Sequence, residues 1–258
     1  MINQVAVLAG SLRYEFRMQI RRRSLWIAMF LVGILQITVF APHANLLTNI
    51  YIHLPLAQTV AELAIMTNFL LPTAFGCLMA DRLPRDRRTK VEDLFISTPG
   101  ALSMRLLGKY LGSMSATFIP VLIFYSLGVC YILYLTGNIQ TLPVALAVLV
   151  VVILPGMLFI SAFSIACPAF MWVPLYQFCF VGYWFWGNFL SPHTGIPTLS
   201  GTILNPEGRL IVAGIFHLDD GQVATQLQGI QSIALLVALA ALVIIVLWSV
   251  LKWQQARQ

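Results

Sequence analysis

Residues 81–109 read DRLPRDRRTKVEDLFISTPGALSMRLLGK. This charged stretch is the starting point for predicting the fold of the whole chain. It holds 7 of the 15 lysines and arginines and 4 of the 9 acidic residues, between two long apolar segments. Positive charge beside an apolar span marks the cytoplasmic side of a membrane. The stretch is therefore expected to be a cytoplasmic loop, residues 81–109, tethered to a membrane at both ends.

The first half of this loop has the pattern of an amphipathic helix. Leu83, Val91, Leu94 and Phe95 can share one face of a helix over residues 83–95, with arginines around the rest. The Thr-Pro-Gly sequence that follows would end this helix. Three interpretations are open: a solvated loop that only sets topology, a helix on the lipid surface, or a helix that docks onto a soluble partner.

The composition is that of an integral membrane protein. Of the 258 residues, 59% are hydrophobic and 9% are charged, whereas soluble domains carry about 25% charged residues. The net charge of +6 does not indicate a nucleic-acid partner, because the basic residues flank apolar segments.

Six apolar segments are suited to cross a bilayer as helices. They cover residues 25–41, 60–80, 110–135, 142–166, 175–190 and 233–251. With both termini in the cytoplasm, 5 lysines and arginines precede the first span, 7 lie in residues 81–109 and 2 follow the last span, so that only Arg209 lies outside. By the positive-inside rule we expect an all-α, six-span protein of the cell's inner (plasma) membrane, with both termini cytoplasmic.

Residues 1–23 also have the pattern of an amphipathic helix. Apolar side chains recur every three or four residues, at Val5, Leu8, Leu12, Phe16 and Ile20. Beside them runs a stripe of Arg13, Arg17 and Arg21. The pattern favours an interfacial helix on the inner leaflet, with arginines at the headgroups, over a plain extension of the first span.

The outer side offers few candidate sites. Residues 191–231 form the longest outer segment, in which the apolar residues 210–216 are too short to span and predict a re-entrant or surface helix. Glu62 could be an ion or proton site, or a side chain that reaches the membrane surface. The sequence His-Leu-Asp-Asp at 217–220 could ligate a cation, although exposed loop residues of this kind are usually only solvated.

The fifth expected span is rich in aromatic residues, including Tyr176, Phe180, Tyr183 and Trp184. Packing together with an outer aromatic belt is the plainer interpretation. The sharper one is that these four residues line a pathway for an amphipathic substrate. The span lacks the row of buried charges expected of an ion-coupled carrier or a channel filter.

The sequence carries no nucleotide-binding motif. Residues 100–109 read GALSMRLLGK, with seven residues between the glycines and Tyr110 after the lysine, whereas a phosphate loop needs four residues and then Ser or Thr. No catalytic signature such as His-Glu-x-x-His or Gly-x-Ser-x-Gly occurs either. We therefore expect a chain that is not an enzyme by itself and binds no cofactor or metal of its own.

The loop also carries a family resemblance. Its local pattern is Asp81-Arg82, Arg85-Asp86-Arg87, Val91-Glu92-Asp93-Leu94-Phe95, Ser97-Thr98-Pro99 and Gly108-Lys109-Tyr110-Leu111. This pattern, with the layout of the whole chain, resembles the membrane subunits of the type 2 ABC transporter (ABC-2) family. Many members read Glu-Leu-Leu before the Ser/Thr-Pro, where this chain has Asp93-Leu94-Phe95.

The resemblance implies a permease subunit of an ATP-driven transporter, with export as the expected direction. The aromatic residues of the fifth span are the basis for expecting an amphipathic or hydrophobic substrate. The resemblance also implies a coupling helix that sits in a cleft of the ATPase, formed here by Leu83, Arg87, Val91, Glu92, Leu94 and Phe95. Two copies of the ATPase would bind ATP and Mg²⁺, and this chain would pair around the pathway with a second copy of itself or with a related permease. The resemblance does not specify the pairing faces; we expect the first and fifth spans, the fifth because of its aromatic residues.

Three other functions compete with this one. An ATP-independent carrier predicts intramembrane charges or inverted repeats, and neither is visible in the sequence. A membrane-embedded enzyme predicts clustered His, Asp or Glu at one leaflet, which is also absent from the sequence. A non-transporting membrane scaffold fits the sequence as well, and only a transport measurement separates it from a transport subunit.

Overall fold

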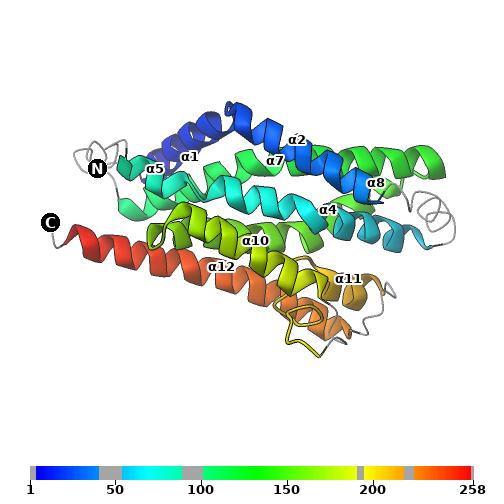
Figure 1. The fold of residues 1–258 in the computed structure, drawn as a ribbon. Helices are drawn as coiled ribbons and strands as arrows, with labels where there is room; N and C mark the ends of the chain where they lie inside the picture. Colours follow the sequence, from blue (N-terminus) through cyan, green and yellow to red (C-terminus); the bar gives the residue numbers. More distant parts are fainter. Residues whose placement is uncertain (1–3, 41–53, 89–100, 191–194, 218–223, 257–258) are drawn as a thin grey trace.

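The computed structural model describes residues 4–40, 54–88, 101–190, 195–217 and 224–256 of the chain. Every regular element within these ranges is helical. The long helices run alongside one another as one elongated bundle, and successive ones run in opposite directions along it (Figure 1). The all-α fold class expected from the sequence is therefore confirmed for the part of the chain that is described.

The described ranges contain helices and no strand. In order they are α1 (Gln4–Ile20), α2 (Arg23–Phe40), α4 (Leu56–Met79), α5 (Arg82–Arg88), α7 (Leu102–Thr136), α8 (Thr141–Val148), the π-helical turn η2 (Leu149–Ile153), α9 (Leu154–Ala166), the 3-10 turn η3 (Cys167–Ala169), α10 (Val173–Phe189), α11 (Arg209–Phe216) and α12 (Gln226–Gln255).

Four described helical runs are long and apolar enough to cross a membrane: Leu56–Asp86, Leu102–Thr136, Thr141–Ala169 and Gln226–Gln255. These four runs contain the second, third, fourth and sixth of the expected spans. The first expected span lies in α2, whose apolar part, Arg23–Thr38, is shorter than the other four. The fifth lies in α10, which has 17 residues. The fold is thus that of a membrane-embedded chain with four candidate spans.

The charged loop is shorter than the sequence predicts. Residues 102–109, expected to belong to it, are the first two turns of α7, so Lys109 is a helical residue that is 9% exposed. At about 1.5 Å per residue, the 35 residues of α7 extend about 50 Å, compared with about 30 Å for a hydrocarbon core. The prediction placed Lys109 in water, whereas the helix can include it because neighbouring carboxylates compensate its charge.

Two other boundaries have local causes. The run Thr141–Ala169 stays helical through Pro155 because the π-helical turn η2 ends two residues before that proline, which has no backbone N–H to donate and lies in the first turn of α9. α12 begins at Gln226, ahead of the expected start at 233, because Thr225 and Gln228 form a capping box that supplies partners for the first free N–H groups.

The apolar residues 210–216 form a helix, as expected, but that helix is not on the surface. Residues Leu210–Gly214 of α11 are buried, and α11 packs against α12 and α4. The preceding residues, 205–208, are buried as well. A Cβ at Gly156 of α9 would lie 2.2 Å from the carbonyl oxygen of Pro206, so only glycine permits this close approach.

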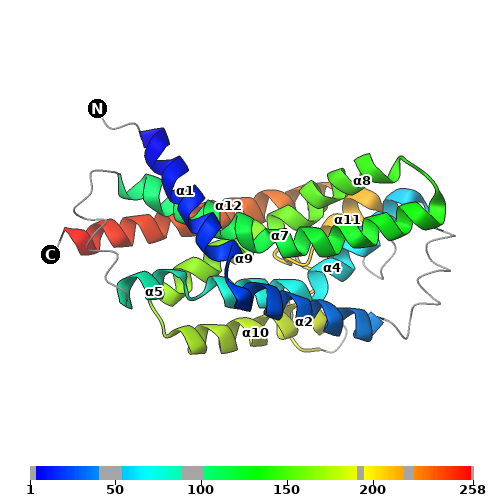
Figure 2. The same ribbon diagram turned by 90° about the horizontal axis from the view of Figure 1, so that it is seen from above.

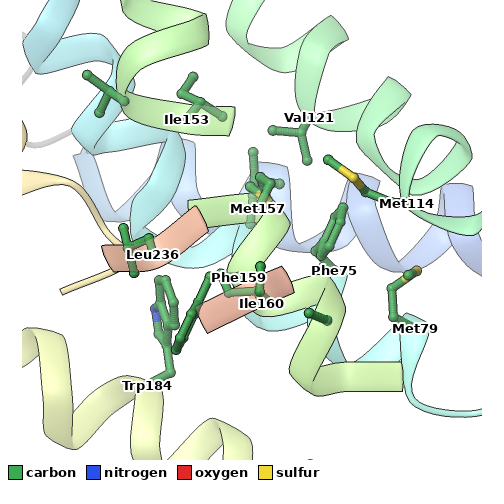
Figure 3. Close-up of a cluster of buried hydrophobic side chains, with 14 of the residues drawn as sticks. Phe75, Met79, Met114, Val121, Ile153, Met157, Phe159, Ile160, Trp184 and Leu236 are labelled. Carbon is green, nitrogen blue, oxygen red and sulfur yellow. The ribbon is translucent and has the colours of Figure 1, made fainter. Parts of the chain in front are cut away.

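The core runs along the bundle, and in one part of it side chains from several helices converge (Figure 3). Trp184, Phe75 and Met157 are among its largest fully buried members, contributed by α10, α4 and α9. The start of α1, α5, the start of α7 and the end of α12 lie together at one end of the bundle (Figures 1 and 2). α11, which begins with Arg209, lies toward the other end.

Candidate functional site

The segment expected to dock onto a partner is described only in its first part. α5 covers residues 82–88, and its Leu83 is half-buried and packs against the core. Arg87 lies on α5, but its side chain is outside the described part of the structure, as are Val91, Glu92, Leu94 and Phe95. Of the four apolar residues expected on the docking face, only Leu83 has a described side chain, and that side chain packs against the bundle.

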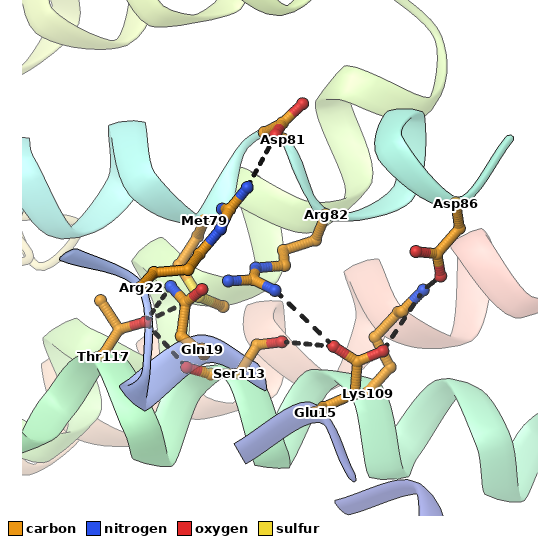
Figure 4. A network of polar contacts seen from close by, with 10 residues as sticks. All are labelled: Glu15, Gln19, Arg22, Met79, Asp81, Arg82, Asp86, Lys109, Ser113 and Thr117. Carbon is orange, nitrogen blue, oxygen red and sulfur yellow. Dashed lines mark hydrogen bonds and ion pairs between the residues drawn. The ribbon is translucent and has the colours of Figure 1, made fainter. Parts of the chain in front are cut away.

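The described part of this segment belongs to a buried network of charges (Figure 4). Glu15 of α1 is 4% exposed and lies between two cations. One of its carboxylate oxygens is 3.8 Å from Nη1 of Arg82 on α5, and the other is 3.7 Å from Nζ of Lys109 on α7. Lys109 also pairs with Asp86 of α5. One cluster of alternating charges therefore joins three helices that are far apart in the sequence.

Small residues on α7 make this contact possible. A Cβ at Gly108 would lie 2.5 Å from Cβ of Ser11, and a Cβ at Gly112 would lie 2.5 Å from the carbonyl oxygen of Leu12. Two glycines four residues apart lie on one face of a helix and allow a second helix to approach closely. The close approach brings Glu15, in the next turn of α1, up to Lys109 and Ser113.

The network is balanced in charge but not in hydrogen bonds. Arg82 is 1% exposed, and none of its three guanidinium nitrogens has a hydrogen-bond partner among the described residues. Its 3.8 Å separation from Glu15 is an ion-pair distance, too long for a hydrogen bond. The attraction between these two charges depends weakly on direction, so α5 can shift against α1 without breaking a directional bond. Loss of Glu15 would leave Arg82 buried without an ion-pair partner among the described residues, whereas loss of Arg82 would leave Glu15 paired with Lys109.

Further contacts extend the network along α1. Nε2 of Gln19 donates a hydrogen bond of 2.9 Å to Oγ1 of Thr117 on α7. Just after α1, Arg22 pairs at 3.4 Å with Asp81, which lies between α4 and α5. That pair is more exposed, with 26% and 37% of the two side chains accessible. The end of α1 is thus tied both to α7 and to the junction of α4 with α5.

The interfacial-helix interpretation of residues 1–23 stays a prediction, and the structure adds which side chains of this helix are buried. The expected helix is present as α1, but the side chains buried in it are polar, Glu15 and Gln19, and Val5 of the apolar stripe is 70% exposed. The other members of the apolar stripe, Leu8, Leu12, Phe16 and Ile20, are half-buried. Glu15 and Gln19 are buried because their partners come from α5 and α7, whereas the arginines of α1 are exposed.

The expected aromatic pathway residues lie inside the single chain. Tyr176, Phe180 and Trp184 are buried and Tyr183 is half-buried. Nε1 of Trp184 donates a hydrogen bond of 2.8 Å to the carbonyl oxygen of Phe69, and the hydroxyl groups of Tyr176 and Ser164 lie 2.8 Å apart. In this conformation the three buried rings hold α10 against α4 and α9 and do not form an exposed wall.

The remaining polar candidates, Glu62 and the sequence at 217–220, stay predictions. Glu62 is half-buried, His217 is exposed, and Asp219 and Asp220 lie outside that part. No group of three or more potential metal ligands occurs among the described residues.

Glu15 was not selected from the sequence as a site residue, although it is the only acidic residue before residue 62. That isolation among arginines was the signal that could have identified it.

No family model matches the sequence, and no curated protein matches it. The geometry of the charge network is therefore the basis on which a function can be argued.

Proposed function

We propose that this chain is the membrane-spanning subunit of an ATP-driven transporter whose ATPase is a separate protein. The observation that carries the proposal is the position of α5. It follows α4 in a single helical run, Leu56–Asp86, and contributes Arg82 and Asp86 to the buried network with α1 and α7. A partner that displaced α5 would also move α4, which is continuous with it, and would pull on α1 and α7 through the ion pairs of Arg82 and Asp86. Coupling of ATP hydrolysis to transport requires such a connection between the docking segment and the membrane helices.

The proposed topology has six spans with both termini in the cytoplasm. α2 and α10 add two crossings to the four long apolar runs, since each extends along the bundle beside its neighbours (Figures 1 and 2). Most lysines and arginines of the described residues belong to α1, α5, the start of α7 and the end of α12, toward one end of the bundle, and Arg209 belongs to α11 near the other end. By the positive-inside rule, the end with α5 is cytoplasmic and the membrane is the inner (plasma) membrane.

Two copies of the chain would form one pathway, served by two ATPase subunits that hold ATP and Mg²⁺. The absence of a nucleotide-binding motif from the sequence supports a separate ATPase. Export is the direction that agrees with the resemblance of residues 81–111 to ABC-2 membrane subunits. An amphipathic or hydrophobic substrate is the class expected from the aromatic residues of the fifth span.

The direct test is pull-down of a soluble ATPase with the full chain, followed by substrate-stimulated ATP hydrolysis in reconstituted membranes. Replacing Leu94 and Phe95 by serine removes two apolar anchors of the expected docking helix, each worth about 1.5–3 kcal/mol when fully buried. The double variant should lose ATPase binding or uncouple hydrolysis from transport.

The matched control removes two exposed apolar side chains near the opposite end of α7. Tyr134 and Ile139 are 85% and 75% exposed, so the Tyr134→Ser, Ile139→Ser protein should bind and couple as the unchanged chain does. If the Leu94→Ser, Phe95→Ser protein also behaves like the unchanged chain, residues 83–95 only set topology. Absence of any bound ATPase and of transport would favour the scaffold function.

A further inference from the structure

A stripe of arginines on α1 has no partner in the described part of the protein. Arg13 and Arg17 on α1, and Arg21 directly after it, are exposed. Successive members are four residues apart, so on a helix they follow one side. None of the three takes part in an ion pair or hydrogen bond with another described residue. Their guanidinium groups therefore remain available to an external anion.

The acidic residue that could neutralise this stripe is turned away from it. Glu15 is the only carboxylate in residues 1–23, and it is buried against Arg82 and Lys109 on the side of α1 that faces the bundle (Figure 4). Arg22 likewise pairs with Asp81. As a result, the exposed side of α1 carries positive charge alone.

The stripe ends where an apolar surface begins. α2 starts at Arg23, and its outward side exposes large apolar residues, among them Ile27 at 59% and Phe30 at 68%. Trp26 is 40% exposed, and its Nε1 donates a hydrogen bond of 2.9 Å to the carbonyl oxygen of Ile20, at the end of α1. Tryptophan is enriched at the membrane–water boundary. α1 crosses the bundle obliquely next to this point (Figure 2).

We propose that Arg13, Arg17 and Arg21 form a binding surface for the headgroups of anionic phospholipids in the inner leaflet. Guanidinium groups bind phosphate oxygens through paired hydrogen bonds. A zwitterionic lipid carries its own cation beside the phosphate, whereas phosphatidylglycerol does not, so the surface selects the anionic lipid. The continuity of the stripe with the exposed apolar side of α2 favours lipid over a soluble protein as the occupant.

Such a lipid would hold α1 from the side opposite the charge network. Glu15 attaches α1 to α5 and α7, and the lipid phosphates would fix its outer side at the membrane surface. The inference depends on α1 lying at the cytoplasmic membrane surface, and it does not depend on transport or on an ATPase.

The experiment measures lipid binding to the full chain, purified in a neutral detergent, by native mass spectrometry during titration with phosphatidylglycerol or phosphatidylcholine. The unchanged chain should prefer phosphatidylglycerol, and the preference should fall as salt is raised. Each basic residue near a membrane surface contributes about a fivefold gain in binding, so Arg13→Gln, Arg17→Gln, Arg21→Gln should lower phosphatidylglycerol affinity about a hundredfold. Phosphatidylcholine binding should change little.

Two further proteins serve as controls. The triple Arg→Lys variant keeps the charges and should retain most of the preference. Lys252→Gln removes an exposed charge near the end of α12 and should leave it unchanged. If the triple glutamine variant misfolds, the single Arg17→Gln change with its expected fivefold loss provides the test. A wild-type preference in a folded glutamine variant would overturn the proposal, and loss of ATPase pull-down in that protein would then assign the stripe to the ATPase.

Discussion

Replacement of Glu15 by glutamine should destabilise the protein more than any other single loss of charge at this end of the bundle. Glu15 is the carboxylate that lies within 4 Å of both Arg82 and Lys109, at 3.8 and 3.7 Å. At an effective dielectric constant of about 20, each pair represents about 4 kcal/mol of attraction, before the cost of desolvation. Removal of one partner from a buried pair costs about 3–5 kcal/mol, because the remaining charge stays buried.

The two cations would not be affected equally. Lys109 keeps Asp86 as a partner in the Glu15→Gln protein, whereas Arg82, 1% exposed, loses the only ion-pair partner described for it. The Glu15→Gln, Arg82→Gln double variant should therefore be more stable than the sum of the two single changes predicts. We expect a coupling energy of about 1–3 kcal/mol in this double-mutant cycle.

Arg22→Gln is the matched control, because it removes an ion pair at the same end of the bundle. The Arg22–Asp81 pair is shorter, at 3.4 Å, but its side chains are 26% and 37% exposed. Water screens such a pair, so its loss should cost less than about 1 kcal/mol. A ranking by distance alone would place this pair ahead of the two pairs of Glu15, whereas a ranking by burial places the pairs of Glu15 ahead of it.

The assay is equilibrium unfolding in mixed micelles with increasing sodium dodecyl sulfate, followed by far-ultraviolet circular dichroism. The free energies of unfolding of the single and double variants give the coupling energy directly. If Glu15→Gln costs no more than Arg22→Gln, or if the cycle is additive, the charges do not act as one network and the reasoning is wrong. In reconstituted membranes with the ATPase, Glu15→Gln should in addition weaken the coupling of hydrolysis to transport.

Three other predictions concern topology, packing and assembly. Single cysteines at Asn138 and Lys252, in a protein without the native cysteines, should react with an impermeant reagent from opposite faces of the membrane; reaction from the same face would contradict the proposed topology. Gly156→Ala should lower the free energy of unfolding by about 1–3 kcal/mol, because its Cβ would lie 2.2 Å from the carbonyl oxygen of Pro206, whereas Gly182→Ala, with nothing within 4 Å of the new Cβ, should be nearly neutral in the same unfolding assay. Light scattering of a transport-competent complex should give two copies of this chain, and a single copy would exclude the proposed dimer.

Much of the helical layout could be predicted because it depends on local chemistry. Long apolar runs without charge form helices in a membrane whatever surrounds them, since the backbone must satisfy its own hydrogen bonds there. This determined the helices that contain residues 60–80, 142–166 and 233–251, and the short apolar run of residues 210–216 indicated α11. The distribution of lysine and arginine along the chain likewise follows from the sequence alone.

The candidate site depended on contacts between distant residues, and the sequence could not determine them. Glu15, Arg82 and Lys109 lie in three separate segments, and each looks like an exposed charge when its own segment is considered alone. Only the packing of α1 on Gly108 and Gly112 brings them together, and burial is possible because each charge then has a partner.

The orientation of each helix about its own axis was also decided by the tertiary structure. The aromatic side chains of α10 point to all sides of that helix. Composition therefore did not show that Tyr176, Phe180 and Trp184 would be the ones that face the bundle. Lipid and a protein core are similarly apolar, so apolar side chains alone do not select which face turns inward. That choice followed from close packing, such as the ring of Phe180 against Gly76, and from polar partners within the bundle, such as the carbonyl oxygen of Phe69 for Trp184.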